Sequence, residues 1–284
     1  MREIWLQFGA RTNQMSRIYL GRHVYGFAAV MFGVLTFVWH DVNLWRQIIP
    51  LGKVPHPEIV LYIAAAIQLF GGLAIQWAPA RRVGSFSLGS IYFIFAALSV
   101  PAIVAKPLVY NNWGSFFEHF SLVSGALIVF GTAGPNNREG APTACPERLT
   151  EGKESNGLAR IGYVSFGICV VSFALEQLAY LSATASLVPK WIPPGQMFWA
   201  ITTTIAFAVA AIAILFGQAA LLASRLLTVM LIGFGLLVWL PIVISHPHTL
   251  FNWTESAETL SIAGVAWIVT DFLTQNRSQA LQAL

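Results

Sequence analysis

The sequence predicts an all-α integral membrane protein with eight transmembrane helices, arranged as two parallel four-helix repeats. Three observations predict it: the 284 residues are 56% hydrophobic and 10% charged, apolar runs of span length recur along the chain, and the second half resembles the first. The mean hydropathy of +0.67 is too high for a water-soluble globule of this size. The bilayer is therefore the solvent that the composition implies.

Apolar runs place the predicted spans, because a helix needs about 20 apolar residues to cross the hydrocarbon core of a membrane. Six runs have nearly this length, and they are 18–39, 59–77, 83–104, 161–181, 197–216 and 226–245. Two shorter runs, 116–131 and 257–270, each carry a carboxylate near one end and complete the set of eight. No cleavable signal peptide precedes the first run, so we expect this helix to remain in the protein.

Positive charges predict the orientation, because Lys and Arg in short loops favour the cytoplasmic side. With the N-terminus inside, twelve of the 16 basic residues are cytoplasmic: Arg2, Arg11, Arg17, Arg22, Arg81, Arg82, Arg138, Arg148, Lys153, Arg160, Arg225 and Arg277. The four on the outside are Arg46, Lys53, Lys106 and Lys190. We therefore expect both termini in the cytoplasm, with a multi-pass topology.

An internal duplication relates the two halves. Residues 101–130 match residues 241–270 at a constant offset of 140, with nine identities in 30 positions, and both segments read P-x5-P-x4-N-W-x4-E. An even number of spans in each half gives the copies the same direction. The predicted organisation is a cytoplasmic segment 1–17, a first repeat 18–131, a flexible cytoplasmic linker 132–158, a second repeat 159–273 and a cytoplasmic tail 274–284.

Several motifs resemble the DoxX-like family of four-helix bacterial membrane proteins in a fused, two-copy form. They are Trp39-His40-Asp41, the stretch 184–193, Leu237-Val238-Trp239-Leu240-Pro241 and the two N-W-x4-E segments, and the likeness covers about 240 of the 284 residues. The resemblance implies a four-helix bundle per copy, the bacterial inner membrane, and partner subunits of thiosulfate- or quinone-linked oxidoreductase complexes. Relatives read Glu-His-Phe where this chain has Glu176, Gln177 and Leu178, so no role of that histidine is carried over.

Three carboxylates are the candidate proton-handling residues. Glu118 and Glu258 lie at matching positions near the outer ends of their runs, and Glu176 lies about four turns into the fifth run. An ionisable group inside a span is costly unless it faces protein, water or a partner, and burial favours its protonated form. The alternative for Glu118 and Glu258 is a structural carboxylate that caps a helix end near the membrane interface.

A polar and aromatic cluster on the outer side is the candidate binding site for a quinone or another cofactor. Its members are His40, Asp41, Asn112, Trp113, His119, Asn252 and Trp253. Interfacial anchoring of Trp and structural hydrogen bonding of His explain them equally well. We predict no metal site and no intrinsic cofactor, since neither the two cysteines nor the six histidines show metal- or haem-ligand spacing.

Three functions are compatible with these features. The first is a membrane subunit of a redox complex, in contact with quinone, whose electron carrier belongs to a partner protein. The alternatives are a small-molecule or lipid transporter, and a membrane scaffold or assembly factor. Catalysis by the chain alone is not expected. The basic residues are scattered through short loops, which argues against a nucleic-acid partner.

Overall fold

A computed structural model describes residues 19–40, 56–133 and 146–282, and the side chains of 146–156 are left undescribed. Helices occupy nearly all of these ranges, and no strand occurs within them. They are α2 (Leu20–Trp39), α4 (Pro57–Ala74), α5 (Arg81–Ala105), α6 (Tyr110–Thr132), α7 (Pro146–Ala179), α8 (Leu181–Leu187), α9 (Gln196–Phe216), α10 (Ala220–Phe234), η2 (Gly235–Trp239), α11 (Leu240–Ser245) and α12 (Leu250–Gln282).

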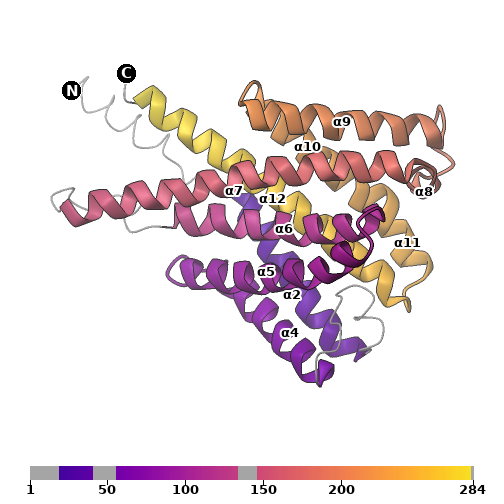
Figure 1. Ribbon diagram of the computed structural model, residues 1–284, viewed down its shortest axis with the longest axis horizontal. Helices are drawn as coiled ribbons and strands as arrows, with labels where there is room; N and C mark the ends of the chain where they lie inside the picture. The colour runs from indigo at the N-terminus through magenta and orange to yellow at the C-terminus, as the bar shows by residue number, and fades with distance from the viewer. Residues whose placement is uncertain (1–18, 41–55, 134–145, 283–284) are drawn as a thin grey trace, which may run out of the picture.

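Eight helical segments in this part of the chain are long and apolar enough to cross a membrane. Seven are single helices, and the eighth joins α10, the π-helical turn η2 and α11 into one stretch, Ala220–Ser245. The all-α class and the eight predicted spans are confirmed at this level. In Figure 1 the start of α7 and the C-terminal end of α12 lie on one side of the bundle, and α8 and α11 lie on the other.

Several helices extend beyond the predicted boundaries. Helix α7 already begins at Pro146, inside the segment 132–158 that was expected to be a flexible linker, and α12 continues to Gln282, through most of the expected tail. Proline suits the first turn of a helix, where its missing N–H is not needed. Neither helix contains a further proline, so polar residues can continue the helical hydrogen bonds. In α7 these polar residues come before the apolar run, and in α12 they come after it.

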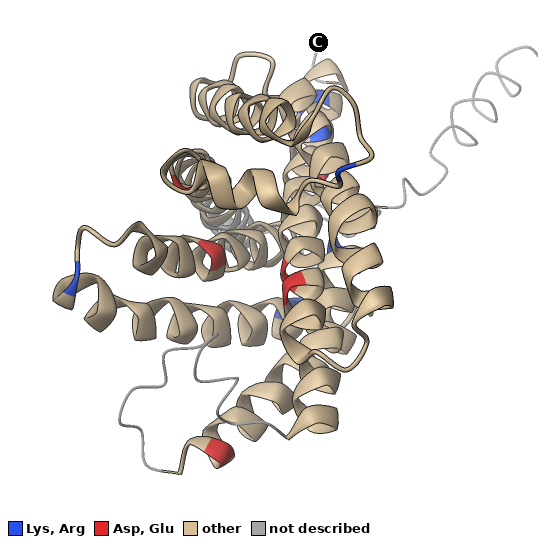
Figure 2. Cartoon of the chain, turned by 90° about the vertical axis from the view of Figure 1, so that its right-hand side faces the viewer, with Lys and Arg blue, Asp and Glu red and all other residues tan. Residues whose placement is uncertain are grey.

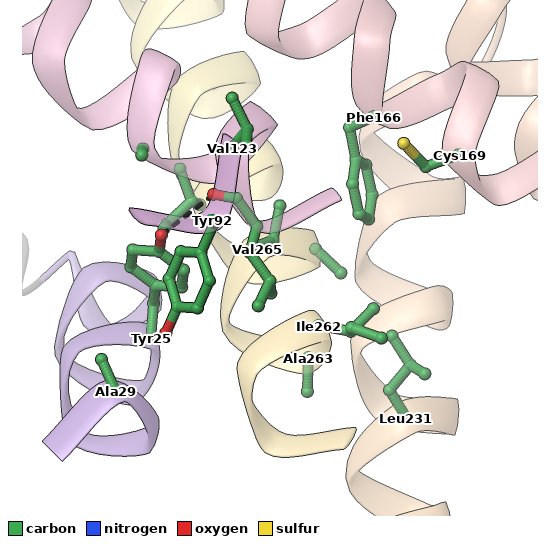
Figure 3. Packing of buried hydrophobic residues seen from close by; sticks show 14 of the residues in the cluster. Tyr25, Ala29, Tyr92, Val123, Phe166, Cys169, Leu231, Ile262, Ala263 and Val265 are labelled. Carbon is green, nitrogen blue, oxygen red and sulfur yellow. Dashed lines mark hydrogen bonds between the residues drawn. The ribbon is translucent and has the colours of Figure 1, made fainter. Parts of the chain in front are cut away.

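The packing of the helices crosses the boundary between the two halves of the sequence. Helix α6 packs against both α5 and α7, whereas α12 packs against α2 and α10, and α6 and α12 also contact each other. One hydrophobic cluster therefore contains residues of both halves (Figure 3), among them Tyr25, Val123, Phe166 and Val265. The Tyr25 hydroxyl donates a hydrogen bond to the Leu122 carbonyl, at 2.9 Å.

The two duplicated segments adopt the same local structure between their prolines and their tryptophans. The Trp113 indole N–H donates to the Pro107 carbonyl at 3.0 Å, and the Trp253 indole donates to the Pro247 carbonyl at 2.9 Å. The segments differ upstream. Pro101 lies inside a continuous α5, whereas Pro241 follows η2, in which the Leu240 N–H bonds the Gly235 carbonyl five residues back.

Glycines allow the backbones of α2 and α12 to touch. A Cβ atom added at Gly264 would lie 2.6 Å from the Tyr25 nitrogen, and one at Gly21 would meet the backbone of Trp267 and Ile268. Backbone atoms cannot move aside as a flexible side chain can. The close crossing of these two helices therefore requires glycine at both positions.

Replacing Gly264 by alanine should therefore destabilise the fold by about 1–3 kcal/mol, the usual effect of overpacking a tight contact. The matched control is Gly233→Ala, because a Cβ at Gly233 meets no atom within 4 Å and alanine favours the helix by up to about 1 kcal/mol. Thermal unfolding of the purified variants in detergent measures both effects. Equal melting temperatures for Gly264→Ala and the unmodified protein would contradict the close contact.

Candidate functional site

Four glutamates from three helices gather inside the bundle. They are Glu118 on α6, Glu176 on α7, and Glu255 and Glu258 on α12. The Glu258 carboxylate is within electrostatic reach of the other three, and Glu118 also interacts with both Glu176 and Glu255. This carboxylate cluster unites the three predicted acids, and it includes Glu118 and Glu258 from corresponding positions of the duplicated segments.

The packing of α6 brings the cluster together. Helix α6 lies between α7 and α12 in the network of contacts, so one of its faces can present Glu118 to both neighbours. The carboxylate of Glu176 packs directly on Gly114, one turn before Glu118, where an added Cβ would collide with it. On α12, Glu255 and Glu258 are three residues apart and so lie on one face of the helix.

Among the residues that the structure describes, no basic side chain pairs with these four carboxylates. Within the described ranges, the one ion pair is that between His56 and Glu58, at 3.5 Å, and it lies at the start of α4. Figure 2 shows how few Lys and Arg residues the helices carry. Four ionised carboxylates this close would repel one another strongly in a medium of low dielectric constant. The cluster therefore needs protons or mobile cations to be stable.

The cluster is accessible as well as enclosed. All four glutamates are half-buried as residues, so none is sealed completely inside the core. Tyr92, which is buried, lies within electrostatic reach of Glu258. No three His, Cys, Asp or Glu side chains in the described residues are arranged to hold a metal ion. The arrangement is suited to holding protons on several exchangeable carboxyl groups.

His119 is adjacent to Glu118 in sequence but has a structural environment. It is buried, its Nδ1 forms a 2.7 Å hydrogen bond with the Ser115 carbonyl, and its ring packs edge-on against Phe95 at 5.6 Å. An Nδ1 that bonds a carbonyl must carry the proton, which leaves Nε2 as the free nitrogen. His119 therefore supports α6 next to the cluster.

The other members of the predicted outer cluster have different partners. His40 ends α2 and bonds the Tyr62 hydroxyl at 2.9 Å, and the Asn112 amide donates to the Ala102 and Lys106 carbonyls at 3.1 and 3.2 Å. The indoles of Trp113 and Trp253 bond their own loops, as described above, and Asn252 lies in the first turn of α12. Asp41 lies outside the described residues. Most of these polar groups thus hold helix ends and loops.

Glu255 is the member of the cluster that the sequence analysis missed. It lies outside the apolar run 257–270, and its counterpart in the first duplicated segment is Ser115, so neither hydropathy nor repetition pointed to it. The available signal was its spacing of three residues from Glu258, which places both carboxylates on the same helical face.

A cavity of about 400 Å³ lies next to the C-terminal end of α7. Residues of α7, α8, α9, α10 and η2 line it, most of them apolar, and Gln177 contributes an amide next to Glu176 in sequence. The Gln177 carbonyl accepts hydrogen bonds from Thr204 at 3.2 Å and Thr203 at 3.4 Å. Its NH₂ group forms no hydrogen bond with the described residues and can donate to a ligand.

Comparison with known proteins adds no relative. No family model, no curated protein and no solved structure matches the chain. The resemblance to DoxX-like proteins therefore remains an expectation from sequence motifs. The geometry of the carboxylate cluster is the basis for a functional proposal.

Replacing Glu255 by glutamine should stabilise the protein by roughly 1 kcal/mol, or about 2–4 °C in melting temperature, because it removes one of four like-charged groups while preserving size. The gain should be larger at pH 9 than at pH 5, since protonated carboxyls repel little. Glu58→Gln is the control, because the Glu58 side chain is 47% exposed. A lower melting temperature for Glu255→Gln at alkaline pH would contradict the repulsion.

Proposed function

We propose that this protein is an integral membrane subunit of a redox complex, and that its carboxylate cluster stores and passes the protons of a quinone reaction. The observation that supports this proposal is that Glu118, Glu176, Glu255 and Glu258 lie together with no basic partner in the described part of the chain. Such groups are arranged to exchange protons, because each ionisation changes the tendency of the others to ionise.

The chemistry divides between this chain and a partner. Reduction of a quinone to a quinol takes two electrons and two protons. The sequence offers proton-holding groups but no Cys or His pattern for an electron carrier. In this proposal a partner subunit supplies the electrons through its own cofactor, while this chain supplies the protons and a site for the lipid-soluble quinone.

The proposed setting follows from the sequence. Two parallel four-helix repeats, with both termini in the cytoplasm, would sit in a bacterial cytoplasmic membrane. The equal local structure of the two proline-to-tryptophan segments supports the repeats, and the distribution of basic residues supports the orientation. The DoxX-like motifs support partner subunits of a redox complex.

The double replacement Glu118→Gln and Glu258→Gln should lower quinone-dependent activity of the complex by about tenfold or more, because glutamine cannot release a proton. The variant should still insert and fold, since glutamine has the same size and removes like-charge repulsion. The control is Glu58→Gln, outside the cluster. An infrared titration of protonated carboxyl groups on the purified chain provides a second readout, which should lose signal in the double variant. Full activity together with an unchanged infrared titration would contradict proton handling by Glu118 and Glu258 and would indicate that both carboxylates are structural.

Purification from mild detergent tests the complex itself. We expect the tagged chain to retain a partner whose absorption spectrum reveals a flavin, haem or iron-sulfur cofactor. Recovery of the chain alone would contradict the redox complex. A cofactor-free assembly would instead favour the scaffold.

The cavity favours a second candidate function, the transport of a small lipid-soluble molecule. Its largely apolar lining, with the Gln177 amide among its few polar groups, suits a ligand that has an apolar body and a hydrogen-bond acceptor. The nearby carboxylates would then couple proton movement to transport.

Gly233→Leu tests the cavity in either function. Gly233 lines the cavity and has open space where a side chain would begin, so leucine should fill the cavity without a clash. We expect the affinity for a short-chain quinone analogue to fall by about tenfold, as measured by quenching of tryptophan fluorescence. The matched control is Gly235→Leu, which also has open space but does not line the cavity. Equal affinity in both variants would exclude the cavity as the binding site.

A further inference from the structure

Two arginines face each other where α2 and α5 begin. Arg22 is in the first turn of α2, and Arg81 is the first residue of α5. Their guanidinium groups are half-buried and close enough to repel each other electrostatically. Like charges are not drawn together in a bundle end without an opposite charge to balance them.

The hydrogen bonding of this arginine pair is incomplete. The Nε atoms of both Arg22 and Arg81 are buried, and neither has a hydrogen-bond partner in the described structure. A buried charged donor without an acceptor is costly, because it has lost its water. The two guanidinium groups therefore have hydrogen-bonding capacity that the described residues do not satisfy.

The protein groups around the pair provide too little negative charge. Asp271 of α12 is the carboxylate that attracts Arg22, and one of its oxygens already accepts a hydrogen bond from the Gly21 N–H, at 3.1 Å. His23 and Gln76 form a hydrogen bond with each other, and neither of these side chains carries a negative charge. Arg82 adds a further positive charge and stacks over the Phe130 ring at 4.7 Å. The described groups at this site therefore carry a net positive charge.

The helix ends add to the attraction for an anion. The N-cap residues of α2 and α5, Tyr19 and Ala80, form no side-chain cap, so N–H groups other than that of Gly21 remain at these helix starts, where the helix dipole favours an anion. Large apolar side chains lie exposed beside the arginines: Leu20 is 42%, Val83 67% and Phe86 65% exposed. A ligand that satisfies both features has an anionic head and an apolar tail.

We propose that Arg22 and Arg81 bind the phosphate group of an anionic phospholipid, with its acyl chains along the apolar start of α5. A phosphate has enough oxygens to accept hydrogen bonds from the guanidinium groups of both arginines. Basic pockets between helices at the membrane boundary are suited to such head groups. The bound lipid would join α2 to α5 at this end of the bundle.

The test uses the full-length protein in mild detergent, with the double replacement Arg22→Gln and Arg81→Gln. Added phosphatidylglycerol should raise the melting temperature of the unmodified protein, and about tenfold more lipid should be needed for the same shift in the double variant. The matched control is the double replacement Arg160→Gln and Arg225→Gln, because both arginines are exposed and the change in net charge is the same. It should respond as the unmodified protein does. Equal lipid dependence in the double variant would overturn the proposal.

Two further measurements identify the ligand. Phosphatidylcholine and inorganic phosphate are tested at the same concentrations, and each should produce a much smaller shift than phosphatidylglycerol. A full shift with inorganic phosphate would overturn the lipid assignment. Asp271→Asn should tighten phosphatidylglycerol binding, because it removes the competing carboxylate while its amide oxygen can still accept from Gly21. Weaker or unchanged binding in this variant would contradict the site, even if the double arginine variant does not fold.

Discussion

Direct contact between helix backbones sets the position of the central helices. At Gly21 and Gly264 the backbones of α2 and α12 meet without side chains between them, and α6 bears on α7 through Gly162, where a Cβ would meet the Ser124 carbonyl. Between helices in a bilayer, water provides little driving force for association, so close van der Waals packing carries it instead. Small residues are therefore required where the two halves meet.

This packing decides where the acids lie. Because α6 contacts both α7 and α12, Glu118 comes near Glu176 on one neighbour and near Glu255 and Glu258 on the other. An isolated carboxylate in a span is expensive, and four together are more so. The glycine contacts hold the helices in close packing. This packing brings together carboxylates from three helices, which no single helix could do.

Charge is distributed differently at the two sites. Within the described part of the chain, the carboxylate cluster is acidic without a cation, whereas Arg22 and Arg81 form a basic pair in which Asp271 attracts Arg22. Each imbalance points to something supplied from outside the chain, protons at one site and an anionic head group at the other. A low dielectric constant makes both requirements strong.

The sequence by itself determined the fold class, the eight spans and the candidate acids Glu118, Glu176 and Glu258, because hydropathy and repetition act locally along the chain. Helix ends were less predictable, since polar residues such as those before Gln282 continue a helix as readily as apolar ones. Only the tertiary structure decided that α6 packs on α7 and α12 on α2, and that Glu255 joins the other acids. These depend on which helix faces meet, and a face has no partner until distant helices pack against each other.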